Sequence, residues 1–286
     1  MILGITNYLN ENIENVNAQI EKILEKVDEE DLHIFIFHDN NYEQTYHKYE
    51  NFKNLTLLTE NQNKGTLYGR TEIIKNIPSI FDNEFLIWLD ADDHIENVDV
   101  LLSVIEKYKK YDYVTYDLKV KCVWLKLVKV GAYKKAVQKF KQYPNLRMRT
   151  AECNILTAAL LDLCKKKEIS YTFFEISEFE FITYMGHHQT FNIKVDLYDN
   201  SKIDNLRCDL EEYIQWIIWR DIDKLDIDLS VNSCDHVYEE NLPRIKELSE
   251  IENNEQIIDK INFLINDIIK DMPENYKKII KANLKI

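Results

Sequence analysis

Short apolar runs alternate with amphipathic stretches along the first 120 residues of the chain. The stretch at 14–26, for example, has apolar residues at the spacing of one helix face: Val16, Ile20, Ile23 and Leu24. We expect strands at residues 2–8, 32–39, 55–60, 84–90 and 111–118. The expected helices lie between them, at residues 14–26, 65–77 and 98–108. Strands that alternate with helices predict βαβ units, and therefore a mostly parallel sheet covered by helices on both faces.

The pattern is less regular beyond residue 120. Further strands and helices are expected, the strands at 123–130 and 191–198 and the helices at 132–140, 150–166 and 206–221. From about residue 240 the chain is predicted to be helical to its end, with Pro243 and Pro273 as boundaries. We therefore expect one domain at residues 1–240 and a helical C-terminal extension at 241–286.

Composition narrows the class of protein. Of the 286 residues, 45% are hydrophobic, which is enough for a sizeable core. No segment approaches the run of roughly 20 apolar residues that a membrane span needs, and the N-terminus lacks the basic start of a signal peptide. The five cysteines form no close pair, which favours a reducing compartment and disfavours a zinc site built from cysteines. These features predict a soluble, cytoplasmic protein without a membrane span.

Charge is distributed unevenly along the chain. The formal net charge is −14, which on average repels nucleic acids and anionic membranes. Residues 107–149 contain thirteen basic and two acidic residues, a local charge of +11. This basic segment has three explanations at this point: solvated helix and strand faces, compensation for the acidic remainder of the fold, or a positive surface for phosphates or an anionic acceptor.

Polar residues follow three of the expected strands at the point where each strand ends. Thr6 and Asn7 end the first strand, Asp39 ends the second, and the fourth ends in LDADD with Asp90 and Asp92. Ligands of open α/β sheets bind outside the carboxyl ends of the strands. Carboxylates this close together repel one another unless a cation neutralises them, and Mg²⁺ or Mn²⁺ takes such oxygen ligands together with substrate phosphates. The cluster is therefore either a metal–diphosphate site or a solvated loop whose aspartates cap the next helix.

A second motif precedes these aspartates. Asn63, Gly65 and Arg70 stand in the order N-x-G-x(4)-R, ahead of the strand that ends in LDADD. This order resembles the family 2 glycosyltransferases of the GT-A fold, and the resemblance covers residues 2–118. The chain departs from the family's pattern at four positions: Asn40, Asn41, Tyr42 and Thr71. The resemblance implies an α/β, Rossmann-like fold with a mostly parallel sheet, a nucleotide-binding half at about 1–120 and an acceptor half at about 121–240.

The resemblance also implies a nucleotide-sugar site. The residues that would form it are Thr6, Asn7, Asp39, Asn63, Gly65, Arg70, Asp90 and Ala91. Asp39 and Arg70 would contact the nucleobase, Thr6 and Asn7 would line the nucleotide pocket, and Asp90 would face the ribose. The expected donor is a sugar linked to a nucleoside diphosphate, with UDP as the first choice.

A divalent cation is the cofactor that the resemblance implies. Asp92, the second aspartate of the DXD motif, would bind Mn²⁺ or Mg²⁺ at the diphosphate of the donor. His236, in CDHVYEENLPR, resembles a late histidine of the family and would be the C-terminal ligand. The alternative for His236 is an exposed or hydrogen-bonded loop histidine.

An acceptor base is the remaining part that transfer to a hydroxyl needs. Two stretches resemble the family's "xED" helix: CDLEEYIQWIIWR, with Glu211 and Glu212, and TAECNIL, with Glu152 followed by Cys153. We favour Glu212 and Glu211, because they open an apolar helix and the segment containing His236 follows them. The alternative for these two is ordinary acidic residues at a helix N-terminus, which the helix dipole favours.

These features predict a metal-dependent glycosyltransferase, inverting, with a glutamate as general base. A nucleotidyltransferase of the same fold would have a glycine-rich basic loop after its first strand, and TNYLNENIEN is not such a loop. Two alternatives stay open: a degenerate GT-A nucleotide-binding module without catalysis, and a sugar transferase that acts on nucleic acid through the basic segment. Salt-dependent binding to DNA or RNA would support the second of these.

Overall fold

The computed structural model describes residues 1–7, 13–39, 52–62, 64–90, 95, 97–115, 126–143, 145–148, 152–175, 200–229 and 255–284. The strands are β1 (Ile2–Asn7), β2 (His33–Asp39), β3 (Leu55–Glu60), β4 (Phe85–Asp90), β5 (Tyr113–Thr115), β6 (Leu127–Lys129) and β7 (Tyr171–Phe173). The helices are α1 (Ile13–Leu24), α2 (Thr66–Asn76), α3 (Val98–Tyr108), α4 (Val130–Val137), α5 (Glu152–Lys165), α6 (Asn200–Ile217), α8 (Glu255–Ile269) and α9 (Glu274–Leu284). Short turns of other helix types lie at η2 (Glu29–Asp31), η4 (Ser79–Phe81) and η6 (Ile218–Ile222).

The strands form one mixed sheet in the order β3-β2-β1-β4-β6-β5-β7. β1 pairs in parallel with β2 and β4, and β2 pairs in parallel with β3. Only β6, among the described strands, runs against its neighbours β4 and β5. The expectation of a mostly parallel sheet in an α/β fold is confirmed.

Helices cover both faces of the sheet, because alternate residues of each strand point to opposite sides. Along β2, Ile34 and Ile36 belong to the core beneath α1 and α3, while Phe35 and Phe37 belong to the core beneath α2, α4 and α5. All four side chains are buried. The strands are therefore apolar on both faces, which leaves polar groups mainly for their ends.

Gly69 sets how closely α2 packs on β2. A Cβ at position 69 would lie 2.6 Å from Cδ1 of Phe37, well inside van der Waals contact. We expect Gly69→Ala to lower the free energy of unfolding by about 1–3 kcal/mol, the usual cost of overpacking a core, as measured by urea denaturation. Adding Phe37→Leu should recover part of this loss. A Gly69→Ala protein as stable as the wild type would show that the helix does not depend on this contact.

Two elements differ from the sequence-based expectation. β7 was not expected: it has three residues and joins the sheet by pairing Tyr171 with Tyr113, far away in the sequence. α6 begins at Asn200 rather than at residue 206, and its last turn continues into the π-helical turn η6. The strand expected at 123–130 is found in part, as β6, and its first three residues lie outside the described residues. The expected strand at 191–198 and the boundary at Pro243 also lie outside them.

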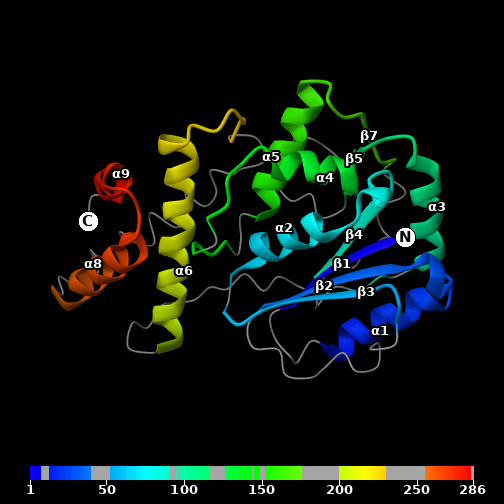
Figure 1. The fold of residues 1–286 in the computed structure, drawn as a ribbon, viewed down its shortest axis with the longest axis horizontal. Helices are drawn as coiled ribbons and strands as arrows, with labels where there is room; N and C mark the ends of the chain where they lie inside the picture. The colour runs from blue at the N-terminus through cyan, green and yellow to red at the C-terminus, as the bar shows by residue number, and fades with distance from the viewer. Residues whose placement is uncertain are drawn as a thin grey trace.

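The C-terminal helices pack on α6. In Figure 1, α8 and α9 lie beyond α6, on the side away from the sheet, and α6 stands beside the end of the sheet opposite the N-terminus. Residues of α6, α8 and α9 share one apolar core, with Leu210, Ile214 and Ile217 facing Ile261 and Ile280. The helical character predicted for the end of the chain is confirmed for residues 255–284, and α9 begins directly after Pro273. None of the described helices is both long enough and apolar enough to cross a membrane.

Candidate active site

The polar ends of the parallel strands meet at one edge of the sheet. The strand register pairs Thr6 with Asp90 of β4, and Asn7 with His38 of β2, one residue before Asp39. In the next pair of strands, Asp39 stands opposite Glu60. Four neighbouring strands therefore end in Asn7, Asp39, Glu60 and Asp90, which we call the carboxyl row. The sequence predicted this row for the first, second and fourth strands but did not include Glu60.

Arg70 lies on α2, beside the strands that end in the carboxyl row. Its side chain is buried, and its guanidinium carbon is 5.3 Å from the centroid of the Trp88 ring, two residues before Asp90 on β4. A guanidinium over an indole ring gains a cation–π attraction, which is stronger when water is excluded. Arg70 is therefore not an exposed residue of a surface helix, while its contact with a nucleobase stays a prediction.

Gly65 brings two distant chain segments together. It has a φ of 82°, which favours glycine, and a Cβ here would lie 2.8 Å from the backbone N and O of Met148. The backbone N of Leu67 donates to the carbonyl O of Met148 at 3.4 Å. The turn that starts α2 thus lies against the segment that leads into α5, whose first residue is Glu152. We call this contact the glycine junction.

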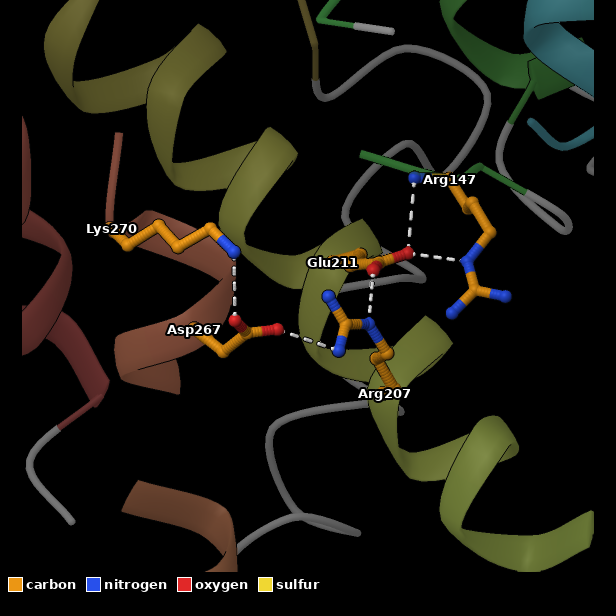
Figure 2. A network of polar contacts seen from close by, with 5 residues as sticks. All are labelled: Arg147, Arg207, Glu211, Asp267 and Lys270. Atoms are coloured by element: carbon orange, nitrogen blue, oxygen red, sulfur yellow. Dashed lines mark hydrogen bonds and ion pairs between the residues drawn. The ribbon is translucent and has the colours of Figure 1, made fainter. Parts of the chain in front are cut away.

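Glu211 of α6 adds a third chain segment to the glycine junction. Its Oε2 accepts from Arg147 Nε at 2.6 Å and from the Arg147 backbone N at 3.4 Å. Its Oε1 accepts from Arg207 Nε at 2.9 Å, as Figure 2 shows. Arg207 in turn donates to Asp267 of α8 at 2.9 Å, and Asp267 accepts from Lys270 at 3.1 Å. The five side chains form a chain of alternating charge from the glycine junction to the C-terminal helices.

The position of Glu211 and Glu212 corrects one argument made from the sequence. Both lie in the middle of the 18-residue α6, which starts at Asn200, and not at the start of a helix. The preference for them as residues that open a helix is therefore wrong, and so is the alternative of acidic residues favoured by the helix dipole, since that effect is confined to the first turn. Glu152 is the candidate that does begin a helix, although its side chain is outside the described set.

A cavity of about 730 Å³ lies between the glycine junction and the C-terminal helices. Gln62 and Lys64, which flank Asn63, contribute one wall, and Arg147 and Glu211 contribute the next. The far wall comes from the turn between α8 and α9. The sequence did not single out this cavity, because its walls are up to two hundred residues apart in the chain and carry no shared local motif.

The basic segment 107–149 forms many ion pairs within its described part. Lys129 lies 3.5 Å from Asp112, Lys134 lies 2.7 Å from Asp82, and Lys139 lies 3.4 Å from Asp162. These pairs favour compensation for acidic residues as the explanation of the charge. A continuous positive surface for nucleic acid is disfavoured for this part of the chain, because the ammonium groups of Lys129, Lys134 and Lys139 are already matched with carboxylates.

His38 is a buried residue that the sequence did not single out. It precedes Asp39 on β2, it is fully buried, and burial lowers the pKa of its imidazole. A neutral imidazole under the carboxyl row adds no charge to that edge. The signal in the sequence was its place at a strand end, but a histidine there has no fixed meaning.

Several predicted site residues lie outside the described set. These are Asn63, Ala91, Asp92 and His236, together with the side chains of Asp39 and Asp90. Among the side chains that the structure does describe, no group of three histidines, cysteines or carboxylates is placed to hold a metal. A hard cation takes oxygen ligands, and the aspartates that follow β4 at the carboxyl row offer such donors. The metal site at Asp92 and His236 stays a prediction.

Known proteins were compared with the chain by sequence and by structure. No family model matches it, and no curated protein matches it significantly. TarS of S. aureus matches over 99% of this chain and 51% of its own, at 15% identity and a TM-score of 0.50. Residues 1–349 of TarS in complex with UDP match over 100% and 85%, at 15% identity and a TM-score of 0.49. The mannosyltransferase PcManGT of Pyrobaculum calidifontis, in complex with GDP-Man and Mn²⁺, matches over 99% and 79%, at 7% identity and a TM-score of 0.47.

The similarity to TarS is a similarity of fold. This chain spans about half of the length of that protein, and the identity of 15% carries no further conclusion. The mostly parallel sheet with helices on both faces and helices at its C-terminal end agrees with it. The chain therefore has the GT-A fold, and its resemblance to the glycosyltransferases of that fold is confirmed at the level of the fold.

Proposed function

We propose that the protein is a metal-dependent, inverting glycosyltransferase that uses a sugar linked to a nucleoside diphosphate, with UDP as the expected nucleotide. The observation that carries the proposal is the carboxyl row: the register brings Asn7, Asp39 and Asp90 to one edge of the sheet. Arg70 and Gly65, from the motif between β3 and β4, lie beside that edge. In open α/β sheets this edge is where nucleotides bind.

Each part of the row has a proposed task. Thr6, Asn7 and Asp39 would line the nucleoside pocket with Arg70, Asp90 would accept from the ribose, and Asn63 and Ala91 would contact the donor. Asp92 and His236 are the residues that would hold Mn²⁺ or Mg²⁺. When bound, such an ion neutralises the negative charge that gathers on the departing diphosphate.

The transfer itself needs a carboxylate from the acceptor side. The acceptor oxygen would form a bond to the anomeric carbon of the sugar as the bond from that carbon to the diphosphate breaks. The proton of the acceptor hydroxyl would pass to the base. Glu211 accepts hydrogen bonds from two arginines, so we assign it to holding the junction. We propose Glu152 as the base because it begins α5 four residues after Met148, and Glu212 is the alternative.

A nucleotide-sugar panel tests the proposed function. We expect one UDP-, GDP-, TDP- or CMP-sugar to raise the melting temperature in the presence of Mn²⁺, because a ligand that binds only the folded state stabilises it. At a ligand concentration of 100 times Kd the gain is about 2.7 kcal/mol. Asp92→Ala should remove the metal-dependent part of the shift while leaving the melting temperature of the free protein unchanged.

Two outcomes would decide against the proposal. If no nucleotide-sugar shifts the melting temperature in a metal-dependent way, the proposed nucleotide-sugar site is rejected. If a nucleotide-sugar binds but no sugar is released or transferred, the chain is the non-catalytic module that the sequence left open. Transfer measured by release of the nucleoside diphosphate separates these two cases.

A further inference from the structure

A charged cavity lies between the glycine junction and the C-terminal helices. Its volume is about 730 Å³, within the range of small-molecule sites. Lys64 and Arg147 line it from the glycine junction, Arg207 lines it from α6, and Tyr276 lines it from α9. Neither Thr6 nor Asn7 is among the described residues that line it. We call it the junction cavity.

The described lining of the junction cavity has a net positive charge, whereas the whole chain has a net negative charge. Among the described residues, the charged lining has five cationic side chains, Lys64, Lys141, Arg147, Arg207 and Lys270, and three acidic ones, Glu211, Asp267 and Asp271. The balance of +2 is opposite in sign to the net charge of −14 for the whole chain. An excess of cationic side chains in a concave surface favours anions there over the acidic remainder of the surface.

The arginines of the cavity are held in place by carboxylates on one side. Arg147 binds Glu211 through Nε at 2.6 Å, and Figure 2 shows its two terminal nitrogens directed away from that carboxylate. Arg207 is fixed between Glu211 and Asp267, both at 2.9 Å. Because carboxylates hold both guanidinium groups, these two cations keep their place in the cavity lining with little further loss of side-chain freedom when a ligand binds.

Lys141 adds a cation of a different kind. Its ammonium lies 4.7 Å from the centroid of the Tyr143 ring, and its side chain is exposed. No carboxylate within the described residues forms an ion pair with it. Lys141 is therefore available to an anion that enters the cavity.

The lining also contains aromatic and apolar side chains. The hydroxyls of Tyr143 and Tyr276 both donate to Asp223, at 2.9 and 3.0 Å, which fixes the two tyrosines. Met272 and Pro273 lie beside Tyr276 in the lining. Rigid aromatic and apolar walls suit the face of a sugar ring, while the cations suit its acidic group.

We propose that the junction cavity binds a saccharide that carries a phosphate or carboxylate group. Gln62 and Lys64 flank Asn63 of the nucleotide-sugar motif, so the ligand would lie next to the donor. Its assignment as the acceptor rests on the proposed function, whereas its binding does not. The chemistry that recognises it is the set of guanidinium and ammonium groups together with the two tyrosines of the lining.

Calorimetric titration of the full chain without nucleotide tests this site. The probes are glucose 6-phosphate, glucuronate, glucose and inorganic phosphate. We expect at least one of the two acidic sugars to bind, more weakly as salt is raised, and to bind about tenfold or more tightly than glucose and than phosphate. Whether the phosphate or the carboxylate form binds better identifies the acidic group.

The variant Lys141→Glu places a negative charge, of the same sign as that of the ligand, in the cavity. It leaves the ion pairs of the arginines unchanged. It should weaken binding of the acidic sugar about tenfold or more. The matched control is Lys110→Glu, since Lys110 is also exposed and its ammonium also lies over a tyrosine, 5.0 Å from the Tyr111 ring centroid. This control should bind as the wild type does.

The proposal is overturned if neither acidic sugar binds, if glucose or inorganic phosphate binds equally well, or if both lysine variants weaken binding to the same extent. The nucleotide-sugar panel tests the proposed function separately. Binding of an acidic sugar by a chain that binds no nucleotide-sugar would retain the cavity and reject the acceptor assignment. Binding of a nucleotide-sugar alone would reject the cavity as a saccharide site and leave the proposed function standing.

Discussion

Glu152→Gln is expected to lower the rate of sugar transfer by about 10²- to 10⁴-fold, the usual contribution of a general base. Glutamine keeps the shape of glutamate but cannot take the proton of the acceptor hydroxyl. The donor would still bind, because its proposed contacts come from the carboxyl row and from Arg70. The measurement is kcat for release of the nucleoside diphosphate, together with the nucleotide-sugar thermal shift of the same variant.

The matched variants are Glu212→Gln and Glu211→Gln on α6. If Glu152 is the base, Glu212→Gln should keep kcat within a few-fold of the wild type. A loss of transfer in Glu212→Gln with full activity in Glu152→Gln would reverse the assignment and restore the preference drawn from the sequence. Because Glu211 joins two arginines, any loss in Glu211→Gln should appear in stability as well as in kcat.

The first half of the fold was accessible to sequence reasoning, for a physical reason. Strands buried on both faces are continuous apolar runs, and the residues that interrupt them are the ones at their ends. The strands at Ile2–Asn7, Leu55–Glu60 and Phe85–Asp90 therefore appeared with bounds close to the observed ones. Their shared polar ends then implied a common edge, and the observed register places Thr6 opposite Asp90.

The contacts of the acceptor half were harder to predict from the sequence, because they are made between segments that are distant in the chain. Nothing near Arg147 in the sequence indicates a partner at Glu211, and nothing near Arg207 indicates Asp267. The start of α6 was misplaced because residues 200–205, NSKIDN, carry little apolar periodicity, so the helix was predicted only from its apolar part. β7 was missed because three residues are too short to give an alternation pattern.

The series of ion pairs from Arg147 to Lys270 also leads to a prediction about the free energy of unfolding. Glu211 is almost fully buried, with 3% of its side chain exposed, while Arg147 and Arg207 are 17% and 33% exposed. Removing one partner of a buried pair costs about 3–5 kcal/mol, because the remaining charge is left uncompensated. Since both arginines retain some contact with water, we expect a smaller loss for Glu211→Ala, about 2–4 kcal/mol in the free energy of unfolding.

Urea denaturation of Glu211→Ala measures this loss, and Asp226→Ala is its control. Asp226 pairs with Lys166 at 2.9 Å, but its side chain is 98% exposed, so its removal should cost less than about 1 kcal/mol. Replacing Arg147 and Glu211 together by methionine should restore part of the stability, because no buried charge is then left alone. Equal effects of Glu211→Ala and Asp226→Ala would mean that the series of ion pairs from Arg147 to Lys270 does not hold the C-terminal helices to α6. The junction cavity would then lose the rigid wall on which its proposed selectivity depends.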